Sequence, residues 1–154
     1  MIEGARASLV DRLVDRDPRS SREARPLRIL DRRALKESVR RDLGWVLNTR
    51  SPVAASQLEG QERTVVNYGL PDFSAMSPQN LDDHQRLAVN ITRTIEAYEP
   101  RLRQPRVRVE EFRDNEKSLR IRIDALLAVG SITEPVSFTA TMRTATGEAV
   151  VDGV

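Results

Sequence analysis

The sequence predicts an α+β protein in which helices come first and an antiparallel β-meander follows. Two long segments, residues 31–48 and 78–98, repeat apolar side chains every three to four positions, as amphipathic helices do. Beyond Pro105 the apolar spacing changes to two, which is typical of strands with one solvated face. Helices followed by a run of strands favour an α+β domain.

A single domain with an N-terminal arm accounts for the length of 154 residues, because compact domains usually contain about 100 to 150 residues. Residues 17–27 are polar, are bounded by two prolines and show no apolar period, so they predict a flexible tether. We therefore expect a short helix and tether over residues 1–27 and a domain over residues 28–154.

The arm is expected to contain one short helix, at residues 8–16. Ser8 can cap its first turn, and the acidic Asp11 follows three residues later. Leu9 and Leu13 are among its apolar residues. So short a helix is not stable alone, and it therefore needs a host surface in its own domain or on another chain.

The helix at residues 31–48 places its apolar side chains on one stripe opposite charged ones. The stripe consists of Leu35, Val39, Leu43 and Val46 or Leu47. Asn48 is expected to end the helix, because asparagine tolerates the left-handed conformation found just after helix ends.

The helix at residues 78–98 has the clearest period. Its apolar face carries Leu87, Ile91, Ile95 and Tyr98. Ser77 and Pro78 suit the N-cap and first helical position, and Pro100 cannot continue the helix.

Strict alternation of apolar and polar residues predicts the strands. Their inward residues are expected to be Val107 and Val109, then Leu119, Ile121 and Ile123, then Val136, Phe138, Ala140 and Met142, with a fourth short strand at residues 149–151. The short polar turn at residues 113–117 predicts that the first two strands form an antiparallel hairpin.

Composition excludes several function classes. Lys and Arg total 25 against 23 Asp and Glu, a net charge of +2, which argues against a dominant nucleic-acid surface. The first 50 residues hold 13 basic and 8 acidic residues, so a nucleic-acid arm stays open as a weaker alternative. The absence of cysteine suits a reducing compartment, and no apolar run is long enough to span a bilayer. We expect a cytoplasmic protein without a signal peptide or membrane insertion.

Catalytic, cofactor and metal residues are not expected. The chain has one histidine, His84, and no cysteine, which excludes histidine-cluster zinc sites and Cys–His nucleophiles. No glycine-rich phosphate loop is present. Paired carboxylates leave a glycosidase open, here a peptidoglycan hydrolase, with Glu96 joined by Glu99 or Asp83. However, Glu96 and Glu99 lie three apart on one helix, as solvated acids often do.

Glu99-Pro100-Arg101 is the sharpest polar signal. A carboxylate in the last turn faces the negative end of the helix dipole, which costs roughly 0.3–1 kcal/mol. Glu99 therefore needs a hydrogen-bond donor, for which Arg101 is near enough, or full solvation. The sequence leaves open a solvated helix end and a motif presented to a partner.

Several segments resemble a known family when they are taken in order. They are residues 8–13 (Ser-Leu-Val-Asp-Arg-Leu), residues 38–50 (from Ser-Val-Arg-Arg-Asp to Asn-Thr-Arg), residues 66–73 (Val-Asn-Tyr-Gly-Leu-Pro-Asp-Phe) and Glu99-Pro100-Arg101. Together they resemble the TssE family of type VI secretion baseplate subunits and the related baseplate wedge proteins of contractile-tail phages. The Asn-Thr-Arg and Asn-Tyr-Gly-Leu-Pro-Asp segments are similar to the secretion branch.

The resemblance implies a structural role in a cytoplasmic baseplate docked to the inner membrane. Its expected partners are the wedge proteins TssF and TssG, with TssK, and the sheath subunits TssB and TssC, which would attach through a β-edge. The expected interaction residues are Leu9, Leu13, Tyr68, Leu70, Glu99, Pro100 and Arg101, with the Glu-Pro-Arg motif holding the wedge core together. Members have been called lysozyme-like, and the residues here do not justify transferring that activity.

Overall fold

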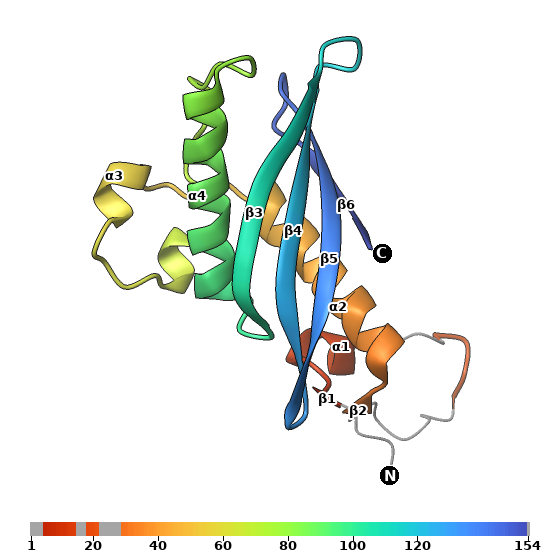
Figure 1. The fold of residues 1–154 in the computed structure, drawn as a ribbon. Coiled ribbons are helices and arrows are strands. Elements are labelled where there is room, and N and C mark those ends of the chain that lie inside the picture. Colours follow the sequence, from red (N-terminus) through yellow and green to blue (C-terminus); the bar gives the residue numbers. More distant parts are fainter. Residues whose placement is uncertain (1–4, 15–17, 22–28, 154) are drawn as a thin grey trace.

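The computed structural model describes residues 5–14, 18–21 and 29–153 and confirms the α+β class (Figure 1). Its elements, in chain order, are β1 (Ala5–Arg6), α1 (Leu9–Leu13), β2 (Ile29–Leu30), α2 (Arg32–Asn48), α3 (Ala55–Leu58), a 3-10 turn η1 (Val65–Asn67), α4 (Leu81–Tyr98), β3 (Leu102–Arg113), β4 (Ser118–Val129), β5 (Ile132–Arg143) and β6 (Ala149–Gly153). No helix within these ranges is long and apolar enough to cross a membrane.

The four C-terminal strands form one antiparallel sheet in the order β3-β4-β5-β6, which is the predicted meander. Arg113 pairs with Ser118 across the first turn, so the predicted hairpin is confirmed. Alternate residues of β4 are buried, and those between them are exposed or half-buried. This alternation gives the sheet one apolar and one solvated face.

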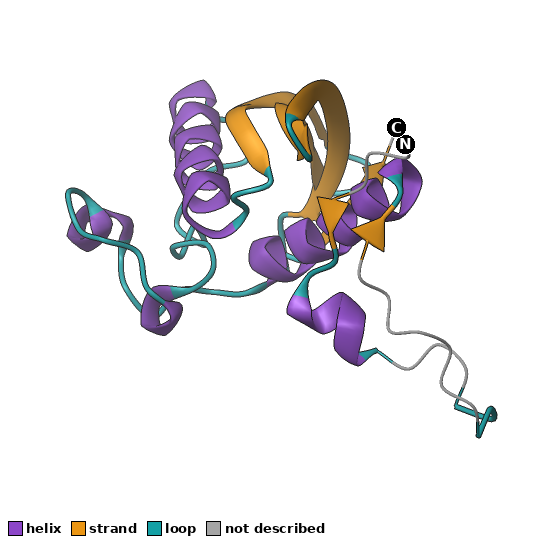
Figure 2. Ribbon diagram, turned by 90° about the horizontal axis from the view of Figure 1, so that it is seen from below, coloured by secondary structure: helices purple, strands orange, loops and turns teal. Residues whose placement is uncertain are grey.

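Both long helices pack on the apolar face of the sheet. Figure 2, seen from below, shows α2 and α4 on the same side of the curved sheet. One hydrophobic cluster joins the helices to the sheet, and its fully buried members include Leu35, Leu43, Ile91, Ile95, Ile121, Ile123 and Phe138. The helix stripes predicted from periodicity are therefore the core.

The end of α2 differs from the prediction. Asn48 is helical and does not adopt a positive φ; among the described non-glycine residues only Gln104 and Lys117 do. Its side chain has a different role: Nδ2 donates to the Ala149 carbonyl at 2.8 Å, and Oδ1 accepts from the Ala149 N–H at 2.8 Å. The asparagine is kept helical because its amide pairs with the backbone of β6.

The start of α4 also differs from the prediction. The helix begins at Leu81, and the cap is Asn80, whose side chain accepts from the Asp82 N–H at 2.8 Å. The Ser77 N–H donates instead to the Asp83 carboxylate at 2.9 Å. Ser77 and Pro78 are therefore not the cap and first helical residue, although they have suitable side chains, because Asn80 caps the helix.

Ser8 caps α1 as predicted, accepting from the Asp11 N–H at 3.1 Å, but the helix already ends at Leu13. Most of the predicted tether, residues 17–27, lies outside the described residues. The short ladder between β1 and β2, which pairs Ala5 with Leu30, was not predicted, because two residues per strand are too few for alternation to be visible.

Candidate protein-interaction site

Six side chains meet where α1, α2 and the C-terminal end of α4 converge. They are Asp11, Ser38, Arg41, Asp42, Glu99 and Arg101, and we call them the junction cluster. In Figure 1 this region lies at the lower end of α4, near α1.

Glu99 is buried, with 3% of its surface exposed, so the solvated helix end considered from the sequence is wrong. Its two carboxylate oxygens accept from Nε and Nη2 of Arg101, the first at 2.6 Å. The Glu99 N–H closes the last helical turn on the Ile95 carbonyl. The chain turns at Pro100, so the Arg101 side chain folds back onto Glu99. This contact offsets the unfavourable interaction between the Glu99 carboxylate and the negative end of the helix dipole.

Arg101 connects the end of α4 to α2. Its Nη1 donates to the Ser38 hydroxyl at 2.8 Å, and its Nη2 also lies 2.5 Å from an Asp42 carboxylate oxygen. Burial by itself disfavours the charged guanidinium, but the hydrogen bonds and charges of Glu99 and Asp42 outweigh it and raise the pKa of Arg101. The planar fork of arginine suits this multiple contact.

Asp11 brings α1 into the cluster. One carboxylate oxygen accepts from the hydroxyls of Ser8 and Ser38, each at 2.7 Å, and the other accepts from Arg41 at 2.6 Å. Burial opposes the charge of Asp11, yet the hydrogen bonds from Arg41, Ser8 and Ser38 hold its pKa well below the ordinary range. A charged network therefore anchors α1 to α2.

Because α1 is anchored by its polar side, its apolar side faces outward. Leu9 and Leu13 are 68% and 74% exposed, and Val10 and Val14 are exposed as well. This is the reverse of an ordinary surface helix, which buries its apolar stripe. Leu9 and Leu13, which were expected to be interaction residues, are therefore exposed on a helix that the junction cluster holds in place.

The loop that carries Tyr68 and Leu70 divides between surface and core. Tyr68 is half-buried and packs edge-on against Tyr98, with ring centres 4.9 Å apart. Leu70 is fully buried, and its N–H donates to the Thr49 carbonyl at 2.9 Å. Leu70 therefore belongs to the core and is not available to another chain, which corrects its assignment as an interaction residue.

Gly69 explains why this loop can approach α2 so closely. It has a φ of +106°, and a Cβ at this position would lie 2.4 Å from the Thr49 carbonyl oxygen. Any other residue would be strained and would clash with the backbone. The two segments that the sequence analysis compared with the secretion branch, around Thr49 and around Gly69, are therefore neighbours in the fold.

The carboxylates considered for a hydrolase do not form a catalytic pair. Asp83 and Glu96 lie 13 positions apart on α4, about 20 Å at 1.5 Å per residue, whereas glycosidases hold their two carboxylates roughly 5–9.5 Å apart. Glu96 and Glu99 are neighbours at the C-terminal end of α4, but they have different surroundings. Glu96 is exposed, and Glu99 is occupied by Arg101.

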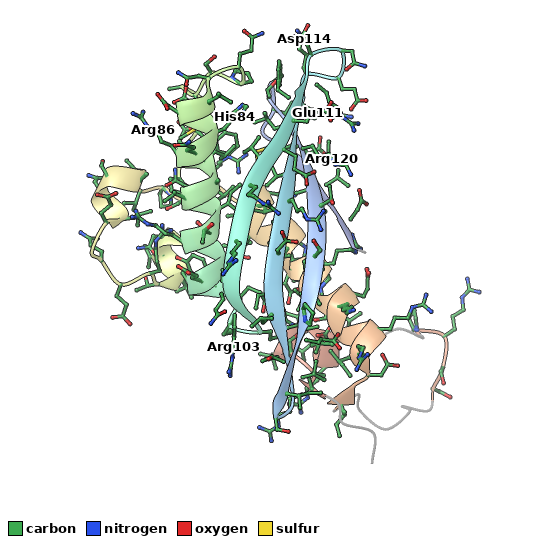
Figure 3. The ribbon with its side chains drawn as sticks, in the orientation of Figure 1. His84, Arg86, Arg103, Glu111, Asp114 and Arg120 are labelled. Atoms are coloured by element: carbon green, nitrogen blue, oxygen red, sulfur yellow. The ribbon has the colours of Figure 1, made fainter. Side chains whose placement is uncertain are left out.

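The single histidine is not part of a catalytic group with these residues. The His84 ring lies 2.6 Å from the Pro78 carbonyl oxygen, near the other end of the molecule from Arg103 (Figure 3). Within the described residues, no cluster of three or more His, Cys, Asp or Glu side chains could hold a metal ion.

Arg101 is the donor that the sequence suggested for Glu99, but the partners of both residues on α2 were not predicted. The signal for these partners was a group of polar residues beside the apolar stripe of α2. They are Ser38, Arg41 and Asp42, which are three positions and then one position apart. Asp11 was noticed only as an acid in a capped turn. Its second role requires contact between residues 27 and 30 positions apart, which no local pattern reveals.

The comparison with protein families agrees with the resemblance found in the sequence. A family model described as baseplate wedge protein gp25 matches residues 33–131, which include Ser38, Arg41, Asp42 and the Glu-Pro-Arg motif. A search of curated proteins found no match. Such a family implies a structural subunit that contacts other baseplate components. The match covers well over half of the chain, and the chain therefore belongs to the baseplate wedge protein gp25 family.

Proposed function

We propose that this protein is the wedge subunit of a type VI secretion baseplate, which joins neighbouring wedge proteins and connects the baseplate to the contractile sheath. The proposed wedge partners are TssF and TssG, with TssK, and the proposed sheath partners are TssB and TssC. The baseplate would lie in the cytoplasm and dock to the inner membrane. Residues 28–154 would form the wedge-type domain, and residues 1–27 its arm.

One observation carries the wedge-joining role: the junction cluster fixes α1 with its apolar side outward. Exposed leucines on a helix held by buried charges are suited to a partner surface, because apolar burial is the main source of association energy. In this proposal the Glu-Pro-Arg motif acts through the geometry it imposes. All three guanidinium nitrogens of Arg101 are already used within the chain, so the motif orders the surface rather than reaching across to a partner.

The secretion branch is supported by the Asn-Thr-Arg and Asn-Tyr-Gly-Leu-Pro-Asp segments, whose resemblance to that branch was noted from the sequence. In the fold these two segments are neighbours, with Gly69 packed against the Thr49 carbonyl. The sheath connection is supported by the C-terminal meander, because a sheet with an open edge can bind an added strand through main-chain hydrogen bonds.

The test is co-expression of the tagged chain with TssF and TssG, followed by co-purification. The double variant Leu9→Ser with Leu13→Ser should lose most of the complex, at least tenfold, without losing its fold as judged by circular dichroism. Leu81→Ser is the control, because Leu81 is 73% exposed but is the first residue of α4, at the end of this helix opposite to Glu99. A complex that survives in the double variant would remove α1 from the interface, and no complex with the parent chain would overturn the secretion assignment.

A further inference from the structure

The solvated face of the sheet carries an excess of positive charge. Figure 1 looks onto this face, with α2 behind the sheet, and none of the described elements covers it there or in Figure 2. On this face β3 and β4 place five arginines and two carboxylates, which are Arg103, Arg106, Arg108, Arg120 and Arg122 with Glu110 and Asp124. Glu111 pairs with Arg113 at 3.1 Å and adds no net charge. The face therefore has three unbalanced positive charges, whereas the net charge of the whole chain is only +2.

One carboxylate on this face holds two arginines that lie opposite each other. Arg108 and Arg122 are directly paired in the register of β3 and β4, and like charges in this position destabilise a sheet. Asp124 accepts from Arg108 at 3.1 Å and from Arg122 at 3.0 Å, and the Ser137 hydroxyl also donates to it. The hydrogen bonds from Ser137 and from the arginines hold the pKa of Asp124 below its ordinary value. Both oxygens of Asp124 are therefore occupied, and it does not neutralise a third arginine.

Arg103 and Arg106 are the arginines left over. Both side chains are exposed, and within the part of the chain that the structure describes neither forms an ion pair with a carboxylate. Arg106 is paired with Asp124 in the register of the two strands, but the carboxylate of Asp124 binds Arg108 and Arg122 instead. Two positive charges at this end of the face are therefore free to bind a partner.

A bulge in β3 puts these two arginines on the same face. In a regular strand, side chains three positions apart point to opposite faces. The pairing with β4 shifts register between Arg103 and Arg106, which lie opposite Leu126 and Asp124. Between them Gln104 has a φ of +50°, a conformation that residues other than glycine seldom adopt. Bulges re-aim side chains, and strained backbone is often found at binding sites, so the bulge is a second indication that this end of the face has a partner.

The spacing of the arginines matches that of acids on one side of a helix. Arg106 and Arg108 are two positions apart on their strand, as are Arg120 and Arg122 on theirs, which is roughly 6.6–6.8 Å along a strand. Acids four positions apart on a helix are separated by about 6 Å along its axis, and long arginine side chains absorb the small difference. Helices are also the usual cover of a sheet face, because their main-chain hydrogen bonds are internal.

We infer that the solvated face of β3 and β4 binds an acidic helix of a partner protein, with Glu or Asp repeated every three to four positions along one side. Arg103 and Arg106 supply the charges that the partner neutralises. Glu110 and Asp124 favour a protein over a nucleic acid, because these carboxylates lie among the arginines and repel a continuous row of phosphates. The face includes neither α1 nor a strand edge, so the inference does not depend on the proposed wedge and sheath partners.

The experiment measures binding of fluorescently labelled, alanine-rich helical peptides to the full chain by anisotropy. The peptides have about 20 residues, because shorter helices are marginal in water, and circular dichroism establishes that they are equally helical. The first carries Glu every three to four positions along one side, the second has the same composition with Glu spread around the helix, and the third carries Lys in place of Glu along one side. We expect the first peptide to bind at least tenfold more tightly than the other two. Equal binding of the two acidic peptides would overturn the inference, because it would show attraction by net charge alone.

Variants of the chain locate the binding face. The double variant Arg103→Gln with Arg106→Gln should weaken binding of the first peptide at least tenfold and should melt like the parent, because neither arginine is paired within the described residues. The control, Arg33→Gln with Arg86→Gln, removes the same charge from exposed positions on α2 and α4 and should bind within about threefold of the parent, since charges that make no direct contact are screened. Figure 3 shows Arg86 on α4, away from Arg103. Full binding by the first variant, or equal losses in both variants, would overturn the inference.

A labelled single-stranded oligonucleotide of similar length to the peptides decides between a protein and a nucleic-acid partner. We expect it to bind at least tenfold more weakly than the first peptide under the same salt conditions, because of the repulsion by Glu110 and Asp124. An oligonucleotide that binds as tightly as the first peptide, and that loses binding in the Arg103→Gln with Arg106→Gln variant, would overturn the inference and make the face a nucleic-acid surface.

Discussion

Two networks of ion pairs in this protein use the same residue types at similar distances but differ in burial. In the junction cluster, the side chains of Glu99 and Asp11 are 4% and 1% exposed. On the solvated face of the sheet, Asp124 pairs with Arg108 at 3.1 Å and with Arg122 at 3.0 Å, and these arginine side chains are 68% and 46% exposed. Burial, rather than the number of pairs, therefore separates a structural network from a surface one.

The two networks also differ in what they connect. Of the sheet-face pairs, Arg108–Asp124 joins β3 and β4, which main-chain hydrogen bonds already join, and Arg122–Asp124 lies within β4. The junction cluster joins α1, α2 and the end of α4, segments with few direct contacts otherwise. Removing a charge from the cluster leaves another charge buried without a partner, which is costly, whereas water replaces a partner on the sheet face.

The largest expected effect is that of Arg101→Ala. It leaves the buried Glu99 carboxylate without its bidentate partner and should lower the free energy of unfolding by about 3–5 kcal/mol. Urea unfolding followed by circular dichroism measures this loss. The double variant Glu99→Gln with Arg101→Ala should recover part of it, because it removes the unpaired charge. A loss below about 1 kcal/mol would contradict the distinction between the two networks.

The second expected effect is that of Asp11→Asn, and it depends on pH. The folded-state pKa of Asp11 is held below its ordinary value, so its charge stabilises the fold above about pH 4, and this contribution is lost as pH falls further. At pH 7 the variant should lose roughly 1–3 kcal/mol, the range for a hydrogen-bonded charged group. Urea unfolding of both proteins at pH 7 and pH 3 measures the difference, which should be smaller at pH 3. A constant difference would show that the charge of Asp11 is not what anchors α1.

The elements of the fold were more predictable than the contacts of the site. The period of Leu87, Ile91 and Ile95 and the alternation of Leu119 and Ile121 each follow from one face meeting the core, so a single sequence reveals them. The partners of Arg101 could not be found in this way, since Ser38 and Asp42 lie 63 and 59 positions away. In a chain with 31% charged residues, many acids could have paired with it, and only the packing of α2 against α4 selects among them.

Individual side-chain roles were also decided by tertiary contacts. Asn48 has the chemistry of a helix-ending residue, but the backbone of β6 offers its amide two hydrogen bonds, and the helical conformation is needed to reach them. Leu70 was expected to be an interaction residue, yet the close approach at Gly69 carries it into the core. In both cases local propensity was outweighed by a partner distant in sequence.

The smallest expected effect is that of Arg108→Ala on the sheet face. Asp124 keeps its contacts with Arg122 and with the Ser137 hydroxyl, and water reaches the vacated position, so the free energy of unfolding should fall by at most about 1 kcal/mol. The difference in free energy of unfolding between the parent chain and Arg108→Ala should vanish in 1 M salt, where the screening length is about 3 Å. The loss caused by Arg101→Ala should persist in the same salt, because its carboxylate partner is buried. Measuring both variants by urea unfolding at low and high salt therefore tests the distinction directly: a salt-independent loss above about 2 kcal/mol for Arg108→Ala would mean that exposure does not separate the two networks.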